Sequence, residues 1–248
     1  MALVNTDAIV LRSYNLAEAD RIVVCLTRSV GLVRAVARGA RRMKSRFGAA
    51  LEPFTLVRLA FYEKENRELV TISTAEILKS QFDMAAELEA GEVLAYISEM
   101  VAAFAPPHEA NERLFRMVVA CVDALHASPK SGNAVLRYFE VWLLRLAGLF
   151  PDVRICAACA CRAAGEMAVY LDSEAMIRCE RCHGRSGLRL SPETQRVLMA
   201  IQQFSPLQFV TDFAPIKEPA ESEVAELTDR LVVRALERRP RTMVVSSR

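Results

Sequence analysis

The sequence predicts an α+β chain of several domains, in which a small β-barrel precedes a helical domain that carries an inserted four-cysteine module. Three observations lead to this expectation. Short apolar segments rich in β-branched residues fill the first 80 residues, apolar residues at helical spacing follow, and five of the seven cysteines fall between residues 156 and 182. The expected boundaries are 1–80 for the barrel, 81–151 for the first helical part, 152–187 for the cysteine module and 188–248 for the second helical part.

The barrel is expected from five strands in about 70 residues, since so many short strands in a small region favour closure of the sheet. Alternation of side chains puts Arg34 and Arg38 on the outer face of the third strand, and Arg58 and Tyr62 on the outer face of the fourth. A basic outer face results. The expected strands are residues 8–12, 21–27, 32–38, 54–62 and 69–74, with a break at 63–68 before the fifth.

Helices are expected from about residue 87, where apolar residues begin to recur at steps of three and four. Residues 106–107, both proline, separate the first two helices. A third helix follows Ser131 and runs to about residue 146. Ser191 is a natural N-cap before Pro192 and opens another helix, and the last spans residues 221–237.

Two Cys-x2-Cys pairs, separated by 19 residues, predict a structural zinc site with Cys156, Cys159, Cys179 and Cys182 as its ligands. Two residues between thiolates allow one tight turn to offer both sulfurs to the same ion. A hairpin that turns at residues 172–174 would bring the two pairs together. Four ligands complete a tetrahedron, so such a site has no open position for a substrate.

The other cysteines are interpreted differently. Cys161 and His183 lie close enough in sequence to replace a ligand, but both are left out of the ligand set because Cys161 breaks the two-residue spacing. Cys25 and Cys121 stand alone in apolar surroundings and are expected to be buried.

The N-terminal part carries most of the positive charge. Residues 1–82 hold 13 Lys and Arg against 8 Asp and Glu, whereas residues 83–150 hold 5 against 9. The segment 28–46 has seven cations and no acid, which is typical of a phosphate-binding surface. Tyr14, Phe47 and Tyr62 are candidates for stacking on bases, and a position in the core is the alternative for each of them. The candidate DNA-binding residues are Arg34, Arg38, Arg41, Arg42, Lys44, Arg46, Arg58 and Tyr62.

These features together resemble the RecO family of bacterial recombination mediator proteins. The resemblance covers the whole chain in order and is strongest in the first 70 residues and at the cysteines. It rests on Tyr14, Glu18, Asp20, Leu51, Leu69 and the segments 8–11, 31–32, 38–42, 44–46, 53–54 and 148–151. Cys161 departs from the simplest pattern of the zinc-bearing members.

The resemblance implies an oligonucleotide-binding (OB) fold for the barrel, followed by a helical domain with an inserted zinc module. It also implies binding of single- and double-stranded DNA and annealing of complementary strands. The implied protein partners are RecR and the C-terminal tail of the single-stranded DNA-binding protein, and together they help to load RecA. The expected location is the bacterial cytoplasm, in association with the nucleoid.

An enzyme is not expected. No His-x-Glu precedes a Cys pair as zinc deaminases require, and no phosphate loop of the Gly-x4-Gly-Lys-Ser/Thr type occurs. No apolar run is long enough to span a membrane.

A zinc-containing RNA-binding or transcription adaptor remains the alternative. The acidic stretch 83–112 argues against DNA binding there, and an acidic tail of a partner is expected to dock near Arg137 and Arg145.

Overall fold

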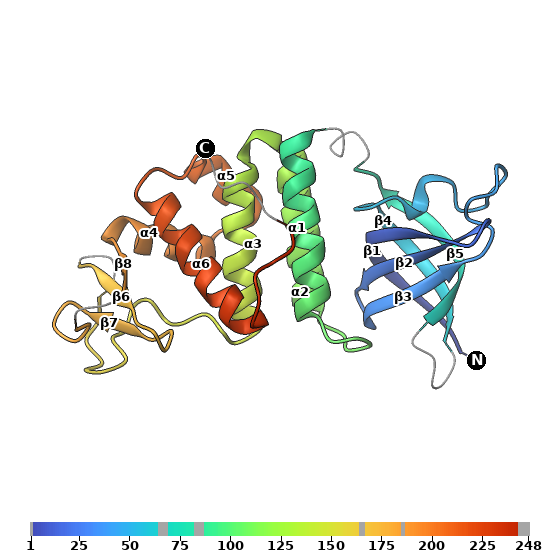
Figure 1. The fold of residues 1–248 in the computed structure, drawn as a ribbon. Helices are drawn as coiled ribbons and strands as arrows, with labels where there is room; N and C mark the ends of the chain where they lie inside the picture. Colours follow the sequence, from blue (N-terminus) through green and yellow to red (C-terminus); the bar gives the residue numbers. More distant parts are fainter. Residues whose placement is uncertain (1, 64–68, 82–86, 164–166, 185–186, 243–248) are drawn as a thin grey trace. The chain divides into compact units, whose positions relative to one another are not determined.

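The computed structural model describes residues 2–63, 69–81, 87–163, 167–184 and 187–242 (Figure 1). Most of the expected break at 63–68 and the start of the acidic stretch, residues 83–86, lie outside the described residues. Contacts between residues divide the chain into two compact units, Met1–Val122 and Asp123–Arg248.

The first unit contains a closed five-stranded barrel, as expected (Figure 1). Its strands follow the order β1-β2-β3-β5-β4, and β4 pairs with β1 to complete the circle. Of the strand pairs described in the barrel, β3 with β5 is parallel and the others are antiparallel. This order is that of an OB-like barrel. The strands are β1 (Ala2–Leu16), β2 (Asp20–Thr27), β3 (Gly31–Ala37), β4 (Leu56–Glu63) and β5 (Leu69–Lys79).

Strand β1 is much longer than the expected strand 8–12, because it pairs with two neighbouring strands, one along each half of its length. Its first half pairs with β4 and its second half pairs with β2. An irregularity between Val10 and Arg12 marks the change, where a bulge bends the strand and increases its twist. One strand therefore spans the seam of the barrel.

Inward-facing residues of all five strands form the barrel core. In β4 the inward residues are Val57, Leu59 and Phe61, as alternation predicts, while Arg58 and Tyr62 are exposed. A 3₁₀ helix, η1 (Gly48–Leu51), adds two apolar residues to the same core.

Two helices follow the barrel, α1 (Leu88–Phe104) and α2 (Glu112–Ala127), on either side of the predicted proline break. The turn between them contacts the β2–β3 hairpin, where the His108 N–H donates to the Leu32 carbonyl at 3.2 Å. Gly31, with a φ of +80°, lies so close that an added Cβ would come 2.1 Å from the carbonyl oxygen of Glu109. Only glycine fits there.

The second unit is mainly helical. The expected helices are present, but α5 was not expected, although Ser205-Pro206 opens it as Ser191-Pro192 opens α4. In both, the serine Oγ accepts a backbone N–H two residues after the proline. These elements are η3 (Pro129–Ser131), α3 (Gly132–Leu146), α4 (Pro192–Gln203), α5 (Pro206–Phe213) and α6 (Ala220–Leu236).

A buried charge network joins α3 to α6. Arg137, only 4% exposed, pairs with Glu140 at 2.9 Å, and both residues bond the Thr228 hydroxyl. The prediction that Arg137 contributes to an acidic-tail docking surface is therefore wrong, because its charge is already neutralised inside the unit. Arg145 is exposed, and its guanidinium lies over the Trp142 ring.

A small sheet of order β7-β6-β8 lies in the cysteine region, with β6 (Val169–Leu171), β7 (Ile177–Cys179) and β8 (Leu188–Leu190). The β6–β7 hairpin is confirmed, whereas β8 was not predicted. Among the helices of the described residues, none has the length and apolar character needed to cross a membrane.

Candidate nucleic-acid interface and metal centre

The basic surface of the barrel consists of six exposed cations on β3 and the loop that follows it. Arg34 projects outward from β3, and Arg38 follows the strand directly. Among the ion pairs that the described residues form with one another, none involves any of the six. The six residues are Arg34, Arg38, Arg41, Arg42, Lys44 and Arg46, and they are called the cation cluster below.

The loop that carries this cluster is attached to the β1–β2 turn. The Gly39 N–H donates to the Asp20 carboxylate at 2.7 Å, and the Arg41 N–H donates to the Ala19 carbonyl at 2.9 Å. The Arg41 guanidinium also donates to the Ala17 carbonyl at 2.8 Å, which fixes the side chain without cancelling its charge. The first half of the loop is thus held by three hydrogen bonds.

Phe47 anchors the far end of the loop and takes the core position, the alternative to base stacking. The residue is 3% exposed and belongs to the barrel core together with Ala50 and Leu51 of η1. Its ring lies inside the protein because η1, which follows it directly, also packs into the barrel core. Arg46 lies with its guanidinium 4.9 Å from the centre of the Phe47 ring, on the solvent side.

Asp7 forms ion pairs with two other cations of the N-terminal region. Its carboxylate pairs with Arg28 at 3.0 Å and approaches Arg58 at 3.8 Å. Glu76 is the cross-strand neighbour of Arg58 on β5. Arg58, although exposed as predicted, therefore lies between two acids and attracts phosphate less strongly than the cation cluster does.

Tyr14 and Tyr62 lie in one lateral row of outward-facing side chains. Register places Tyr14 opposite Ile22, Ile22 opposite Val36, Val36 opposite Thr71, and Thr71 opposite Tyr62. Tyr14 is 48% exposed and Tyr62 is 40% exposed. The row crosses β3 at Val36.

Arg34 and Arg38 stand on either side of this crossing, because residues two apart share a face of a strand. Leu3, also exposed, is the next member of the row beyond Tyr62. Sequence reasoning missed Leu3, since only the β1–β4 register places it there.

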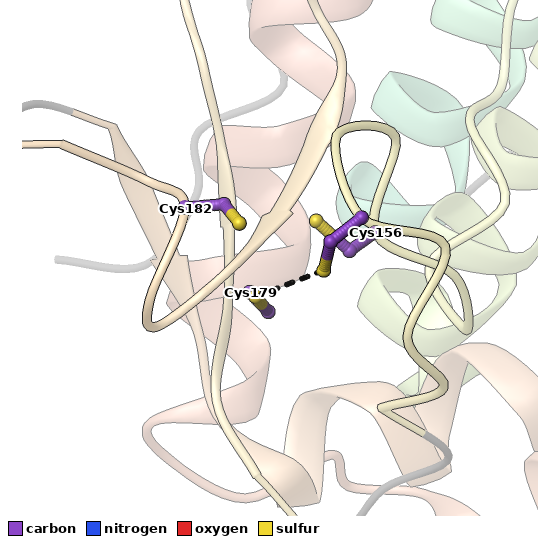
Figure 2. Close-up of side chains that lie close together, drawn as sticks. Cys156, Cys179 and Cys182 are labelled. Atoms are coloured by element: carbon purple, nitrogen blue, oxygen red, sulfur yellow. Dashed lines mark hydrogen bonds between the residues drawn. The ribbon is translucent and has the colours of Figure 1, made fainter.

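The four predicted ligands form one cluster. Each offers a sulfur, and the four sulfurs lie within 4.8 Å of one another. The sulfurs of Cys159 and Cys179 are 3.7 Å apart, close to the separation of about 3.8 Å that a tetrahedral ion with zinc–sulfur bonds of about 2.3 Å requires. Figure 2 shows the sulfurs of Cys156, Cys179 and Cys182 facing the same space. The donor set fits a tetrahedral, thiophilic ion such as Zn²⁺.

Backbone hydrogen bonds shape both cysteine turns and hold them together. The Ala160 N–H donates to the Cys156 carbonyl at 2.9 Å, and the Cys182 N–H donates to the Cys179 carbonyl at 2.9 Å. The Ala157 N–H donates to the Ile177 carbonyl of β7 at 2.8 Å and so links the first turn to the hairpin.

The hairpin turn itself is organised by Asp172, within the predicted turn 172–174. Its carboxylate accepts the N–H groups of Glu174 and Met176 at 2.9 Å and pairs with Arg178 at 2.8 Å. Burial works against the charged carboxylate, but these bonds, led by the one from Arg178, lower its pKa.

The first ligand is prepared for metal binding as a thiolate. Burial opposes the charged form of Cys156, yet hydrogen bonds from the backbone N–H groups of Cys179, Cys159 and Ala158 lower its pKa to about 6. A thiolate is the form that binds a metal, so this geometry favours coordination.

The remaining cysteines and His183 lie outside the four-sulfur cluster. The His183 ring stacks on Tyr170, with ring centres 3.7 Å apart. Cys25 and Cys121 are fully buried, as predicted, and burial raises the pKa of the Cys25 thiol to about 12. Cys161 is half-buried next to the cluster.

Two family models match the chain. The model described as "Recombination protein O N terminal" matches residues 1–81, and the model described as "Recombination protein O C terminal" matches residues 86–243. The first match covers the barrel, and the second covers the helices together with the cysteine region.

Relatives described as "DNA repair protein RecO" are similar over long segments. The protein from Bifidobacterium longum subsp. infantis is 33% identical over 226 residues, which is 88% of this chain and 89% of that protein. The protein from Symbiobacterium thermophilum is 34% identical over 77% of this chain and 76% of that protein. The match to the Koribacter versatilis protein, 34% identical over 63% of this chain, spans 64% of that relative, under two thirds of its length.

Proposed function

The chain belongs to the RecO family of DNA repair proteins, and from that premise we propose that it binds single- and double-stranded DNA through its barrel and anneals complementary strands. The observation that carries the proposal is the cation cluster, six exposed cations on a closed barrel whose outer face also carries the exposed Tyr14 and Tyr62. Phosphates would lie along the cations, and bases would stack on Tyr14 and Tyr62.

Annealing follows from the same charges. Two phosphate backbones repel each other as they approach, and fixed cations between them reduce that repulsion. The loop that carries Arg41, Arg42, Lys44 and Arg46 provides four such charges on one short segment. Arg58 contributes less to the interface, because Asp7 and Glu76 lie beside it.

The protein partners in this proposal are RecR and the C-terminal tail of the single-stranded DNA-binding protein, and with them the chain would help to load RecA. The exposed Arg145 is a candidate contact for an acidic tail. The protein would act in the bacterial cytoplasm at the nucleoid and would catalyse no bond-making reaction. In this proposal the chain divides into a barrel at 1–80, helical parts at 81–151 and 188–248, and a zinc module at 152–187.

Zinc is the proposed ion of the four-cysteine cluster, with a structural role. When bound, it would join the two cysteine turns and contribute about 10 kcal/mol or more to the folding of this region. The chain's own residues would contribute four thiolates, and backbone N–H groups stabilise that of Cys156.

The decisive experiment replaces the loop cations. The variant Arg41→Ala/Arg42→Ala/Lys44→Ala/Arg46→Ala should bind single-stranded DNA roughly a hundredfold more weakly near 0.1 M salt, and the slope of log affinity against log salt should fall by about 3. Affinity is measured by fluorescence anisotropy over a salt series. Unchanged affinity would refute the proposed interface.

A matched control removes the same charge elsewhere. The variant Arg113→Ala/Arg116→Ala/Lys130→Ala/Arg196→Ala also loses three exposed arginines and one exposed lysine, but these lie on α2, η3 and α4. It should keep most of the affinity. An equal loss in both variants would indicate that total charge, rather than the loop, governs binding.

The alternative function, a zinc-containing RNA-binding or transcription adaptor, predicts another preference. Single-stranded DNA, duplex DNA and RNA of one sequence are compared in the same assay, together with the rate of strand annealing. Clear preference for RNA without annealing would favour the adaptor.

A further inference from the structure

One apolar side chain stands among the cations of the barrel loop. Met43 lies between Arg42 and Lys44, and its side chain is fully exposed, more so than any other large apolar side chain in the described part of the chain. Single exposed apolar residues are common on protein surfaces and need no ligand to explain them. The place of Met43 within the loop is what distinguishes it.

Met43 lies at the tip of a hydrogen-bonded turn. The Ser45 N–H donates to the Arg42 carbonyl at 2.9 Å, which closes a four-residue turn with Met43 and Lys44 at its centre. The central positions of turns favour Gly, Pro, Asn, Asp and Ser. Turn chemistry therefore does not account for a methionine here, and its full exposure shows that packing does not account for it either.

The tip is held on both sides. Before it, the Gly39 N–H is bonded to the Asp20 carboxylate at 2.7 Å. After it, the Phe47 N–H donates to the Ser45 hydroxyl at 3.3 Å, and the Phe47 ring is fixed in the barrel core. Because both flanks are attached to the barrel, the turn can press Met43 against a ligand while the rest of the loop stays in place.

The surroundings of Met43 favour DNA as that ligand. The two residues beside it belong to the cation cluster, and the segment 28–46 contains no acid. In DNA, apolar surface lies between anionic phosphates at the stacked faces of neighbouring bases. Aliphatic side chains, methionine among them, can enter a base step of duplex DNA and partly unstack it.

We propose that Met43 is a wedge that enters duplex DNA between two adjacent base pairs, while Arg42 and Lys44 bind the phosphates on either side of that step. The inference rests on the duplex binding proposed above, to which it adds a residue that distorts the bound duplex. A step opened in this way is untwisted, so less free energy is needed to separate or exchange the strands there.

The test measures this untwisting, because the measurement does not require a known binding position. A closed circular plasmid is incubated with the full-length protein and a type IB topoisomerase, the proteins are removed, and the linking number is determined by gel electrophoresis. The change is expressed per bound protein molecule. The unchanged protein and Met43→Leu should lower the linking number to a similar extent, whereas Met43→Ala should lose most of the effect.

Two controls separate the wedge from binding itself. Met43→Ala keeps all six members of the cation cluster, so it should bind single-stranded DNA within about twofold of the unchanged protein. Leu88→Ala removes the next most exposed large apolar side chain among the described residues, at the start of α1, and should untwist the plasmid as the unchanged protein does.

The outcomes distinguish this inference from the function on which it rests. If the unchanged protein did not bind duplex DNA, the proposed function itself would be wrong. If it bound duplex DNA without lowering the linking number, only the wedge would be overturned. Equal untwisting per bound molecule by Met43→Ala would overturn the wedge as well, and so would an equal loss in Leu88→Ala.

A second measurement detects the unstacked bases directly. A short duplex with 2-aminopurine at several steps should become more fluorescent when it is saturated with the unchanged protein or with Met43→Leu, because 2-aminopurine is quenched by stacking. Saturation with Met43→Ala should give little increase. An equal increase with this variant would contradict insertion of the Met43 side chain.

Discussion

Neighbouring carboxylates decide which arginines of the barrel are available to a ligand. Arg28 and Arg58 share the carboxylate of Asp7, while Arg34 on β3 and Arg38 directly after it have no ion pair among the described residues. A run of cations in a sequence therefore overstates the charge that a phosphate meets. The register of β1 against β4 places Asp7 beside Arg58, and the pairing of β1 with β2, continued by the bond from the Arg28 N–H to the Asp7 carbonyl, places it beside Arg28.

Among the single residues of the barrel, the exposed Tyr14 and Tyr62 should contribute to single-strand binding through their rings. Tyr62→Ala is expected to cost about 1–3 kcal/mol of binding free energy per stacked base, because the π-face is lost, whereas Tyr62→Phe keeps the ring and most of the affinity. Anisotropy titrations with an oligonucleotide measure both. Similar losses for the two variants would contradict stacking and would point instead to the hydroxyl.

Among the elements, the β2–β3 hairpin and the α1–α2 turn depend on one close backbone contact. Gly31→Ala should destabilise the protein by about 2 kcal/mol or more, since the added Cβ meets the Glu109 backbone at a positive φ. Gly48→Ala is the control, because Gly48 also has a positive φ but nothing within 4 Å of the added atom. Urea denaturation measures both, and equal losses would show that the contact itself adds no cost.

A second prediction about the elements concerns the packing of α3 on α6. Arg137→Met should cost about 3–5 kcal/mol of unfolding free energy, because it leaves the buried carboxylate of Glu140 without its cation. Arg137→Met/Glu140→Leu removes both charges and should recover much of that loss. Chemical denaturation of the two variants gives the comparison. A double variant less stable than the single one would indicate that the pair stabilises the fold by itself.

For the whole molecule, the division into two units predicts that an ion bound by the four-cysteine cluster, as proposed, supports only one of them. The cysteine sheet is attached to the second unit through bonds from Gln195 to the Met167 carbonyl and from Arg234 to the Ser173 carbonyl. Chelation should therefore raise amide hydrogen exchange in the β6–β8 sheet and in the adjoining ends of α4 and α6.

The barrel strands should keep their protection after chelation, since their core contains no residue of the cysteine region. Hydrogen-exchange mass spectrometry before and after addition of chelator resolves the two parts. Loss of protection in β1–β5 would show that the units are coupled in folding.

Periodicity and spacing along the chain were enough to predict the five strands, most of the helices, the cluster of four cysteines and the exposed cations, because each of these depends on residues close in sequence. The short elements α5 and β8 escaped prediction because eight and three residues give little periodicity.

Only the tertiary structure decided which side chains the long-range contacts remove from solvent. Phe47 enters the barrel core, Asp7 neutralises Arg28, and Arg137 is buried between helices, and each outcome depends on partners far along the chain. Closure of the barrel through the parallel β3–β5 pair likewise depends on strands that are far apart in the sequence. Local patterns carry the direction of a side chain relative to its own strand or helix, but the neighbour that it meets is set by register and packing between distant segments.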